Sequence, residues 1–376
     1  MAAYDVAVVG LGAMGSAALF ELARRGRQVI GIEQFPLGHD KGSSHGESRV
    51  IRLAYFEHPS YVPLLRRAYE NWRDLERLSG ETVLTVTGVL EAGRPDSELV
   101  AGSLAASRLH GLAHEVLDAA EIKARFPAFD LPPDYTGVWQ GDGGYLKPER
   151  ASALHRELAQ QHGAAIRSET KVRAIESGDA GVRIVLDGDA IEAARVVVCA
   201  GAWIGELAPV LKPHLHLTRQ VLCWYAPKLP AQFAPGALPV FLIDSDDDMV
   251  YGFPDFAGSG FKCASHRGAE VLANAEAARQ DAGPADEART RRFLERYMPG
   301  GAGALRAMKT CIYTMTPDED FIVDLAPGDS RIVLASPCSG HGFKFASLMG
   351  EVLTDLALDG GTGWDISRFR LGRFGG

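Results

Sequence analysis

The stretch Val8–Ala17, VVGLGAMGSA, decides the fold of this chain. It places Gly10, Gly12 and Gly15 in the spacing GxGxxG, after an apolar strand-like run and at the start of an expected helix over residues 13–25. The first glycine permits a tight turn, the second lets the backbone approach a pyrophosphate, and the third allows close helix packing. Because the helix N-terminus also favours negative charge, we predict a βαβ unit that binds a dinucleotide.

An acidic residue follows where such a unit needs one. The strand-like run QVIGIE ends at Glu33, about 20 residues after the glycines, where a carboxylate accepts a hydrogen bond from a ribose hydroxyl. Ala13, Met14 and Gln34 lie beside these positions and are included in the expected cofactor site. The fingerprint alone does not separate NAD from FAD.

Length and composition point to a globular protein with a small-molecule partner. The chain has 376 residues, which suggests two domains, and is 46% hydrophobic and 23% charged. Its net charge of −9, without a basic run, argues against nucleic acid or an anionic membrane. With neither a signal peptide nor an apolar run of roughly 20 residues, we expect a cytoplasmic protein. The five scattered cysteines lack a CxxC pair and are expected to be reduced thiols.

The order of strand and helix patterns predicts an α/β protein with two interleaved domains. Residues 1–80, 147–217 and 305–376 carry the βαβ unit, further helix and strand patterns, and a final strand, glycine-rich turn and helix, so we assign them to a Rossmann-like cofactor-binding domain. Residues 81–146 and 218–304 carry strand-like runs separated by turns. We assign these to an α+β substrate domain on a mixed, largely antiparallel sheet.

Two polar clusters are interpreted as structural, and no metal site is predicted. His214 and His216 are expected on one face of a strand, but no third ligand is nearby. The acidic run DSDDDM, from Asp244 to Met249, lacks the glycine and distal glutamate of a calcium loop and is expected to be a hairpin turn.

The loop after Glu33, QFPLGHDKGSSHGESRVIRLAY, is polar and glycine-rich, as the long groove for a flavin requires. It opens a series of motifs in the order HGESRVIRLAY, YGFPDFAGSGFKCASH, CIYTMTPDEDF and SGHGFKFAS. Through them nearly the whole chain resembles the monomeric sarcosine oxidase and N-methyl-L-tryptophan oxidase branch of the D-amino-acid oxidase superfamily. The resemblance implies a monomer with FAD that oxidises an N-methyl or secondary amino acid with O2 and releases hydrogen peroxide.

The resemblance also implies how the cofactor is held. Cys311, in the CxY motif, corresponds to the cysteine that is joined through its sulfur to the flavin. Cys338 is a competing candidate beside the glycine turn, which we interpret as a packing residue because the family does not generally show cysteine there. The expected cofactor-binding residues are Gly10, Gly12, Ala13, Met14, Gly15, Glu33, Gln34, Ser43, Ser44, His45, Arg49, Val172, Gly201, Trp203, Cys311, Gly340, Gly342, Phe343 and Lys344.

Substrate and oxygen residues follow from the same motifs. The resemblance implies that Arg52 and Lys344 hold the substrate carboxylate, a task suited to a guanidinium and a second cation. Arg49 corresponds to a residue over the flavin face, and Lys262 to the lysine thought to activate oxygen, since a positive charge stabilises reduced oxygen as it forms. The remaining expected substrate contacts, of which the first three are also expected catalytic residues, are His266, Tyr251, Tyr313 and Leu242.

Three alternatives stay open at this point. Leu242 and the small residues of KCAS suggest a roomier pocket, which favours a bulkier or a cyclic amino acid such as pipecolate or proline. A flavin dehydrogenase with another electron acceptor shares the FAD and carboxylate sites but does not need Lys262. A non-catalytic dinucleotide-binding protein shares only the N-terminal fingerprint.

Overall fold

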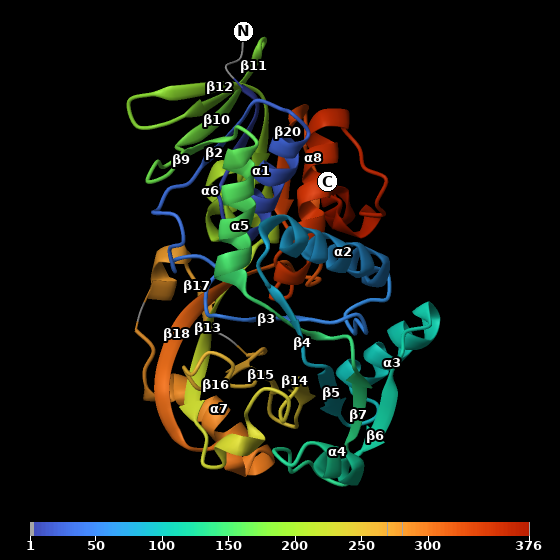
Figure 1. The fold of residues 1–376 in the computed structure, drawn as a ribbon. Coiled ribbons are helices and arrows are strands. Elements are labelled where there is room, and N and C mark those ends of the chain that lie inside the picture. Colours follow the sequence, from blue (N-terminus) through green and yellow to red (C-terminus); the bar gives the residue numbers. More distant parts are fainter. Residues whose placement is uncertain (1–3, 269, 280, 376) are drawn as a thin grey trace.

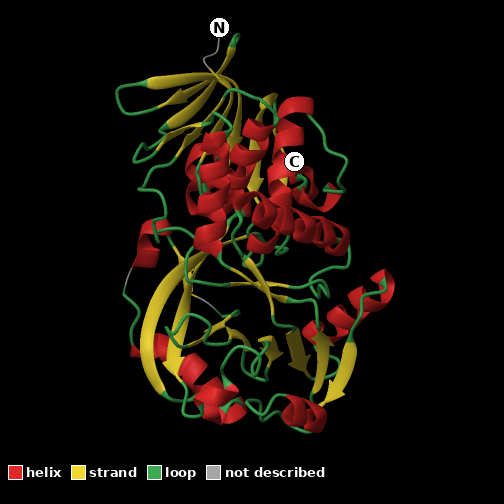
Figure 2. Ribbon diagram, viewed as in Figure 1, coloured by secondary structure: helices red, strands yellow, loops and turns green. Residues whose placement is uncertain are grey.

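The computed structural model describes residues 4–268, 270–279 and 281–375. The chain crosses several times between an upper and a lower half, and its N- and C-terminal parts lie together in the upper half (Figure 1). Helices gather against a sheet in the upper half, whereas the lower half is built mainly on strands (Figure 2). Within the described residues, no helix is both long and apolar enough to cross a membrane.

The first sheet contains the glycine fingerprint at the end of its central strand. Its parallel part has the order β9-β2-β1-β12-β20, while β10 and β11 form an antiparallel extension of β12, and β19 pairs antiparallel with β20. Its described strands are β1 (Tyr4–Val9), β2 (Val29–Ile32), β9 (Ala165–Arg167), β10 (Ala174–Gly178), β11 (Gly181–Val185), β12 (Ala190–Val198), β19 (Ile322–Ala326) and β20 (Asp329–Ser336).

Both faces of the parallel sheet are covered, which explains the continuous apolar run of β1. Val6 and Val8 pack into a core with the helices α1 (Ala13–Arg24), α2 (Tyr61–Ser79), α5 (Pro148–Gln161) and α8 (Ala346–Asp359). Ala7 and Val9 point to the opposite face of the sheet. They belong to a second core, which also contains residues of β11 and β12 and Leu371 near the C-terminus. Helix α2 buries one face, on which Leu64, Ala68, Trp72 and Leu75 recur at helical spacing.

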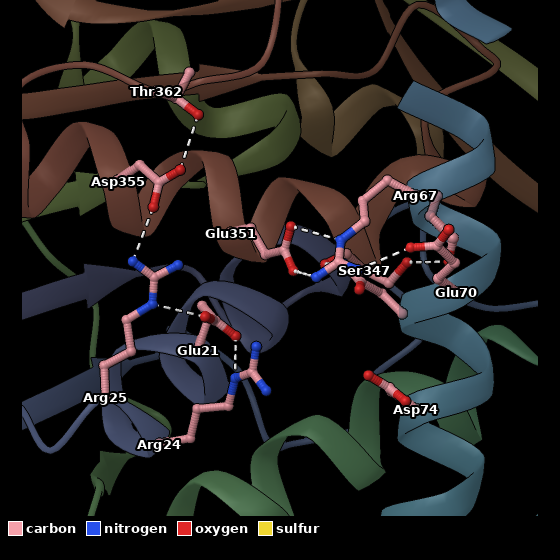
Figure 3. A network of polar contacts seen from close by, with 12 residues as sticks. Glu21, Arg24, Arg25, Arg67, Glu70, Asp74, Ser347, Glu351, Asp355 and Thr362 are labelled. Carbon is pink, nitrogen blue, oxygen red and sulfur yellow. Dashed lines mark hydrogen bonds and ion pairs between the residues drawn. The ribbon is translucent and has the colours of Figure 1, made fainter. Parts of the chain in front are cut away.

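Ion pairs join three of these helices at the surface (Figure 3). Glu21 of α1 accepts a bond of 2.7 Å from Arg25, which also contacts Asp355 of α8 at 2.8 Å. Arg67 of α2 donates two bonds, of 3.1 and 2.6 Å, to Glu351 of α8. The arginines of these pairs remain partly exposed to solvent, so each pair contributes little, and the apolar core beneath them remains the main source of stability.

The second sheet forms the lower half and is antiparallel except where β14 runs parallel to β5. Its described order is β17-β13-β16-β15-β14-β5-β7-β6, with β18 along β13. Three helices, α3 (Glu98–His110), α4 (Ala119–Arg125) and α7 (Pro284–Tyr297), pack on it. The strands are β5 (Val89–Gly93), β6 (Glu115–Asp118), β7 (Thr136–Gln140), β13 (His216–Ala226), β14 (Val240–Asp244), β15 (Met249–Phe253), β16 (Phe261–Ser265), β17 (Glu270–Leu272) and β18 (Ala304–Met315).

A small antiparallel sheet connects the two halves. It consists of β3 (Arg49–Ile51), β8 (Gly144–Leu146) and β4 (Leu84–Val86). The short helix α6 (Ile204–Leu207) and several 3-10 segments complete the described elements: η1 (Gly201–Trp203), η2 (Pro209–His214), η3 (Pro230–Gln232), η4 (Ala275–Arg279), η5 (Pro299–Gly301), η6 (Phe343–Phe345), η7 (Ser367–Phe369) and η8 (Leu371–Phe374).

The predicted α/β class, with a parallel sheet and a largely antiparallel one, is confirmed, as is the hairpin, since Asp244 pairs with Met249. Two details differ from the prediction. All of strand β18 except Ala304 falls within 305–376, which we assigned to the cofactor-binding domain, but the strand pairs antiparallel with β13 of the second sheet along nearly its whole length. His214 ends η2 and stacks on Phe374, whereas β13 begins at His216, so the two histidines do not share a strand. The limits of the two domains remain a prediction.

Candidate active site

A large cavity lies where the carboxyl ends of the parallel strands meet the second sheet. It is lined by residues that follow β1, β2, β12 and β20, and by residues of β13, β14, β15 and β18. Its empty volume, including the open mouth, is about 2070 Å³. Ligands of open α/β sheets bind at this edge of the sheet, so the cavity is the candidate active site.

Most of the predicted site residues come together in its wall. Those that line it are Gly10, Gly12, Ala13, Met14, Glu33, Gln34, Leu242, Ser43, Ser44, Arg49, Arg52, Val172, Gly201, Trp203, Tyr251, His266, Cys311, Tyr313, Gly340, Gly342, Phe343 and Lys344. Gly15, His45 and Lys262 are not part of the lining. Cys338, which we interpreted as a packing residue, does line the cavity.

The three fingerprint glycines have different spatial roles. Gly10 has φ +91°, and a Cβ there would lie 2.5 Å from the carbonyl oxygen of Cys199. A Cβ on Gly15 would lie 1.8 Å from the carbonyl oxygen of Gly10, so this glycine is needed for helix packing. A Cβ on Gly12 would meet only the hydroxyl of Ser44, at 3.5 Å. Gly12 therefore faces open space at the N-terminus of α1, as a phosphate site requires.

Glu33 is anchored beside this turn. Its carboxylate accepts hydrogen bonds from the backbone N–H groups of Leu11, at 2.9 Å, and Phe35, at 3.1 Å. Burial raises the pKa of Glu33, but His39 and these N–H groups outweigh burial and lower the pKa below its usual value. Glu33 is therefore ionised at neutral pH and can accept a hydrogen bond from a ribose hydroxyl.

The loop before β3 is folded around the guanidinium of Arg49. Arg49 donates hydrogen bonds of 2.8 Å to the carbonyl of Ser43 and 2.6 Å to that of His45. The Ser43 hydroxyl in turn donates to the carbonyl of Ile312, at 2.6 Å. These bonds place Arg49 beside the strand that carries Cys311.

His45 lies at the back of this loop with no visible partner. Its side chain is buried, and neither ring nitrogen makes a hydrogen bond to another described residue. Burial lowers the pKa of His45 to about 4, so the ring is neutral at pH 7. Buried polar atoms are normally satisfied, so these two ring nitrogens are an exception among the described residues.

Lys262 projects from β16 toward the same loop. Its ammonium donates to the carbonyl of Gly46 at 2.6 Å, and to the carbonyl and hydroxyl of Ser48 at 3.0 and 3.1 Å. It also lies over the rings of Trp224 and Phe253. Burial and the charge of Arg49 lower the pKa of Lys262. Three oxygen partners nevertheless match the three N–H groups of the charged form.

Arg52 is buried and already surrounded by acceptors. It donates two bonds to Glu57, of 3.0 and 2.9 Å, and one of 2.8 Å to the carbonyl of Ala54. Its Nε lies 3.0 Å from a carboxylate oxygen of Glu91. Burial raises the pKa of Glu57, but the charges of Arg52, His341 and Lys344 and the hydrogen bonds from Arg52 together outweigh burial and lower the pKa to about 2. A ligand carboxylate must therefore compete with Glu57 for this guanidinium.

Lys344 supplies a second cation near Arg52. Its ammonium donates to the carbonyl of His341 at 2.7 Å and to the hydroxyl of Tyr55 at 3.4 Å. The backbone of Lys344 is held in place because the indole of Trp72 donates to its carbonyl at 2.9 Å. Burial and the charge of Arg52 lower the pKa of Lys344 to about 7. A negatively charged ligand at this position would favour its protonated form.

Aromatic side chains of the second sheet complete the wall. Tyr313 of β18 contacts His266, with 3.5 Å between its hydroxyl and Nδ1, and Tyr251 of β15 lies edge-on to the same imidazole. Burial lowers the pKa of His266 to about 4, so the ring is neutral at pH 7. This part of the wall thus presents the rings of two tyrosines and one imidazole that is neutral at pH 7.

Several residues of this site were not predicted from the sequence. Glu57 and His341 line the cavity, and Glu91 lies just behind it. Glu149 accepts bonds from the N–H groups of Gly46 and Glu47, at 2.6 and 3.0 Å, and so shapes the Arg49 loop. The position of Glu57 five residues after Arg52 is a signal that could have been found, because an acid near a buried arginine commonly pairs with it.

Comparisons with known proteins agree with this geometry. The family described as FAD dependent oxidoreductase matches residues 5–356. The chain is 38% identical to a monomeric sarcosine oxidase of Bacillus sp. (strain NS-129), over 98% of this chain and 97% of the relative. It is 35% identical to an N-methyl-L-tryptophan oxidase of Yersinia pestis (strain Pestoides F), over 99% of both chains. The structure of NikD, described as an unusual amino acid oxidase, superposes with a TM-score of 0.87 at 25% identity and covers 98% of both chains.

Proposed function

The chain belongs to the family of FAD dependent oxidoreductases, and from that premise we propose that it oxidises N-methyl or other secondary amino acids, uses O2 as acceptor and releases hydrogen peroxide. One observation carries the proposal: Arg52 and Lys344 lie in the same cavity as the glycine fingerprint. Two cations beside a dinucleotide site suit a substrate that carries a carboxylate.

The residues present fit FAD. Gly12 leaves space for a pyrophosphate, Glu33 is ionised beside it, and the cavity continues from this turn to Cys311. We propose that Cys311 holds the cofactor covalently through its sulfur, with Cys338 as an unattached neighbour.

Substrate binding is assigned to the far end of the cavity. The substrate carboxylate replaces Glu57 on Arg52 and contacts Lys344, while Leu242 and Tyr251 form the wall against the rest of the molecule. His266 brings no positive charge to the site at pH 7, so it does not repel the substrate amine. These contacts hold the carbon next to the amine in a fixed place.

The redox step belongs to the cofactor. When bound, FAD accepts a hydride equivalent from the carbon next to the substrate nitrogen and later returns the electrons to O2. The oxidised substrate is an imine, which water hydrolyses after release. The cations of Arg49 and Lys262 are assigned to stabilising negative charge on oxygen as it is reduced. We further propose that the protein acts as a cytoplasmic monomer.

The test is oxidation of a panel of amino acids by the purified yellow protein. Sarcosine, N-methyl-L-tryptophan, proline and pipecolate are offered, and both oxygen consumption and peroxide release are measured. Peroxide formed in equal amount to the oxygen consumed supports the proposal. Reduction of the flavin without oxygen consumption would instead indicate a dehydrogenase with a different acceptor.

A further inference from the structure

Glu91 lies behind the cavity and contacts Arg52, one of the two cations assigned to substrate binding. The residue belongs to β5, and its side chain is fully buried, as is that of Arg52. The Nε of Arg52 and an oxygen of Glu91 are 3.0 Å apart, although they are not aligned as a hydrogen bond, and that oxygen has no other hydrogen-bond partner among the described residues. The contact is therefore an ion pair that a small shift of either group can strengthen or release.

The surroundings of Glu91 contain few groups that favour its charge. From α3, the hydroxyl of Ser103 donates a bond of 2.7 Å to its second oxygen. Arg52 and Lys344 favour the ionised form, whereas the nearby charge of Glu57 opposes it. Burial is the largest influence and raises the pKa of Glu91 to about 7. Glu91 can therefore change its charge near neutral pH.

Two carboxylates already share one guanidinium in this site. Glu57 lines the cavity and pairs with Nη2 of Arg52, while Glu91, which is not part of the cavity wall, lies beside its Nε. A substrate carboxylate that displaces Glu57 would become the new partner of Arg52 beside an ionised Glu91. Like charges so close in a buried site disfavour one another, and the favourable response is protonation of the weaker acid. Displaced Glu57 loses the cation that lowers its pKa, but it lines the cavity and can turn its charge toward the open mouth. Glu91 is fully buried behind the cavity and can respond only by taking up a proton.

We propose that Glu91 is a positioning residue that acts through Arg52: it is ionised while the pocket holds no substrate, and it takes up a proton when a substrate carboxylate binds. Once Glu91 is protonated, it no longer competes with the ligand carboxylate for the charge of Arg52. The inference rests on the proposed function, because it assumes that the pocket binds carboxylates. It also predicts that substrate affinity depends on pH through a residue that does not line the cavity.

The proposal predicts a specific pH dependence. Below about pH 6 Glu91 is already protonated, so binding requires no proton from solvent at this residue. Above about pH 7 each binding event must take up a proton, and carboxylate affinity falls by up to about tenfold per pH unit. The isosteric change Glu91→Gln removes this requirement. We expect it to tighten binding about tenfold or more at pH 8.5 and to leave it within about twofold at pH 6.

Lys344 is the second group near Arg52 that titrates close to neutral pH, and it would also take up a proton when an anion binds. The change Lys344→Arg retains a positive charge at this place and removes its titration from the measured range, because an arginine stays protonated. The effect of Glu91→Gln is therefore measured in both the wild-type and the Lys344→Arg backgrounds.

The experiment measures ligand binding rather than turnover. Pyrrole-2-carboxylate, whose α-carbon has no hydrogen to lose, is titrated into each holoenzyme by calorimetry in two buffers with different ionisation enthalpies. The buffer difference gives the protons taken up per ligand. We expect uptake above pH 7 in the Lys344→Arg protein and its loss in the Lys344→Arg, Glu91→Gln protein. Equal proton uptake in these two proteins would overturn the proposal.

Two further variants keep the result interpretable if Glu91→Gln folds poorly. Ser103→Ala removes a hydrogen bond that favours ionised Glu91 and touches no substrate, so the pH at which affinity falls should move upward. Glu115→Gln, at an exposed position of the same sheet, should change nothing. An unmoved pH profile in Ser103→Ala would also overturn the role of Glu91. Failure of the wild-type protein to bind any carboxylate would instead refute the proposed function itself.

Discussion

The guanidinium of Arg49 lies 3.9 Å from the sulfur of Cys311. Arg49 is fixed there by the carbonyls of Ser43 and His45, and the loop itself is tied to the neighbouring Ile312. Of the two cysteines considered for attachment of the cofactor, Cys311 is the one for which this contact is observed.

The change Cys311→Ala is expected to abolish covalent attachment of the flavin. After precipitation with acid, the yellow colour should remain in the pellet of the wild-type protein and move to the supernatant for the variant. Cys338→Ala is the matched control, because Cys338 lines the same cavity, and its pellet should stay yellow. Colour retained by Cys311→Ala but lost from Cys338→Ala would reverse the assignment.

The change Lys262→Met should slow reoxidation of the reduced flavin much more than its reduction by substrate. Loss of one group that stabilises developing charge costs roughly 100- to 1000-fold in rate, and only the oxygen step develops this charge near Lys262. Stopped-flow absorbance measures the two half-reactions separately. Lys309→Met, at an exposed position of β18, should alter neither. Equal slowing of both steps by Lys262→Met would argue for a structural role.

Replacement of Arg52 by Met should weaken both substrate binding and folding. The variant leaves two buried carboxylates, Glu57 and Glu91, without their cation, which costs about 3 to 5 kcal/mol of unfolding free energy. Urea unfolding of the holoenzyme gives this value. Arg150→Met removes a more exposed arginine that also pairs with two carboxylates, and should cost no more than about 1 kcal/mol. A similar loss of unfolding free energy in both variants would show that Arg52 matters no more for folding than an exposed arginine.

The change Gly12→Ala should lower the flavin content without unfolding the chain. The added methyl group meets no atom closer than the Ser44 hydroxyl at 3.5 Å, but it fills the space that a pyrophosphate needs. Gly15→Ala should instead prevent correct folding, since its Cβ overlaps the carbonyl of Gly10. The ratio of flavin to protein absorbance and the thermal transition measure the two effects. Gly361→Ala, which meets no neighbouring atom, serves as control.

The protein should lose stability below about pH 6.5, in part through His155. This residue is buried between the rings of Phe20 and Trp72, and burial followed by the charge of Arg156 lowers its pKa to about 3. Because the folded pKa is depressed, the unfolded chain binds a proton that the folded chain excludes, so the unfolding free energy falls as pH decreases through this window.

His155→Phe keeps an aromatic ring in place and removes this titration. Between pH 6.5 and pH 5 we expect the variant to lose about 2 kcal/mol less than the wild-type protein, as measured by urea unfolding at each pH. His216→Phe, on the exposed start of β13, should follow the wild-type profile. A profile of His155→Phe that coincides with that of the wild-type protein would contradict this contribution.

The parts of the structure that depend on local sequence were predictable. The glycine spacing and the apolar run before it specify a strand, a tight turn and a helix within a few residues, and these elements form as expected. The motifs around Arg52, Tyr251, Cys311 and Lys344 also converge in one cavity.

Contacts between elements that are far apart in the chain could not be predicted from the local sequence. In the run VLEAG, Glu91 resembles an exposed position of a half-buried strand, and its burial depends on α3 and on Arg52, which lie elsewhere in the chain. The direction of Lys262 toward residues 46–48 likewise depends on how β16 meets the Arg49 loop. Long-range pairing also determines that β18 joins the second sheet.

The three hydrogen bonds of Lys262 have a further consequence for the proposed chemistry. Every N–H group of its ammonium is already donated to Gly46 or Ser48, so this residue has no spare hydrogen to give. It can contribute its charge to oxygen, but not a proton unless one of these bonds breaks. The protons that convert reduced oxygen to hydrogen peroxide must then come from other sources, namely the reduced cofactor, the substrate amine or water. Proton delivery is therefore a separate task from charge stabilisation in this fold.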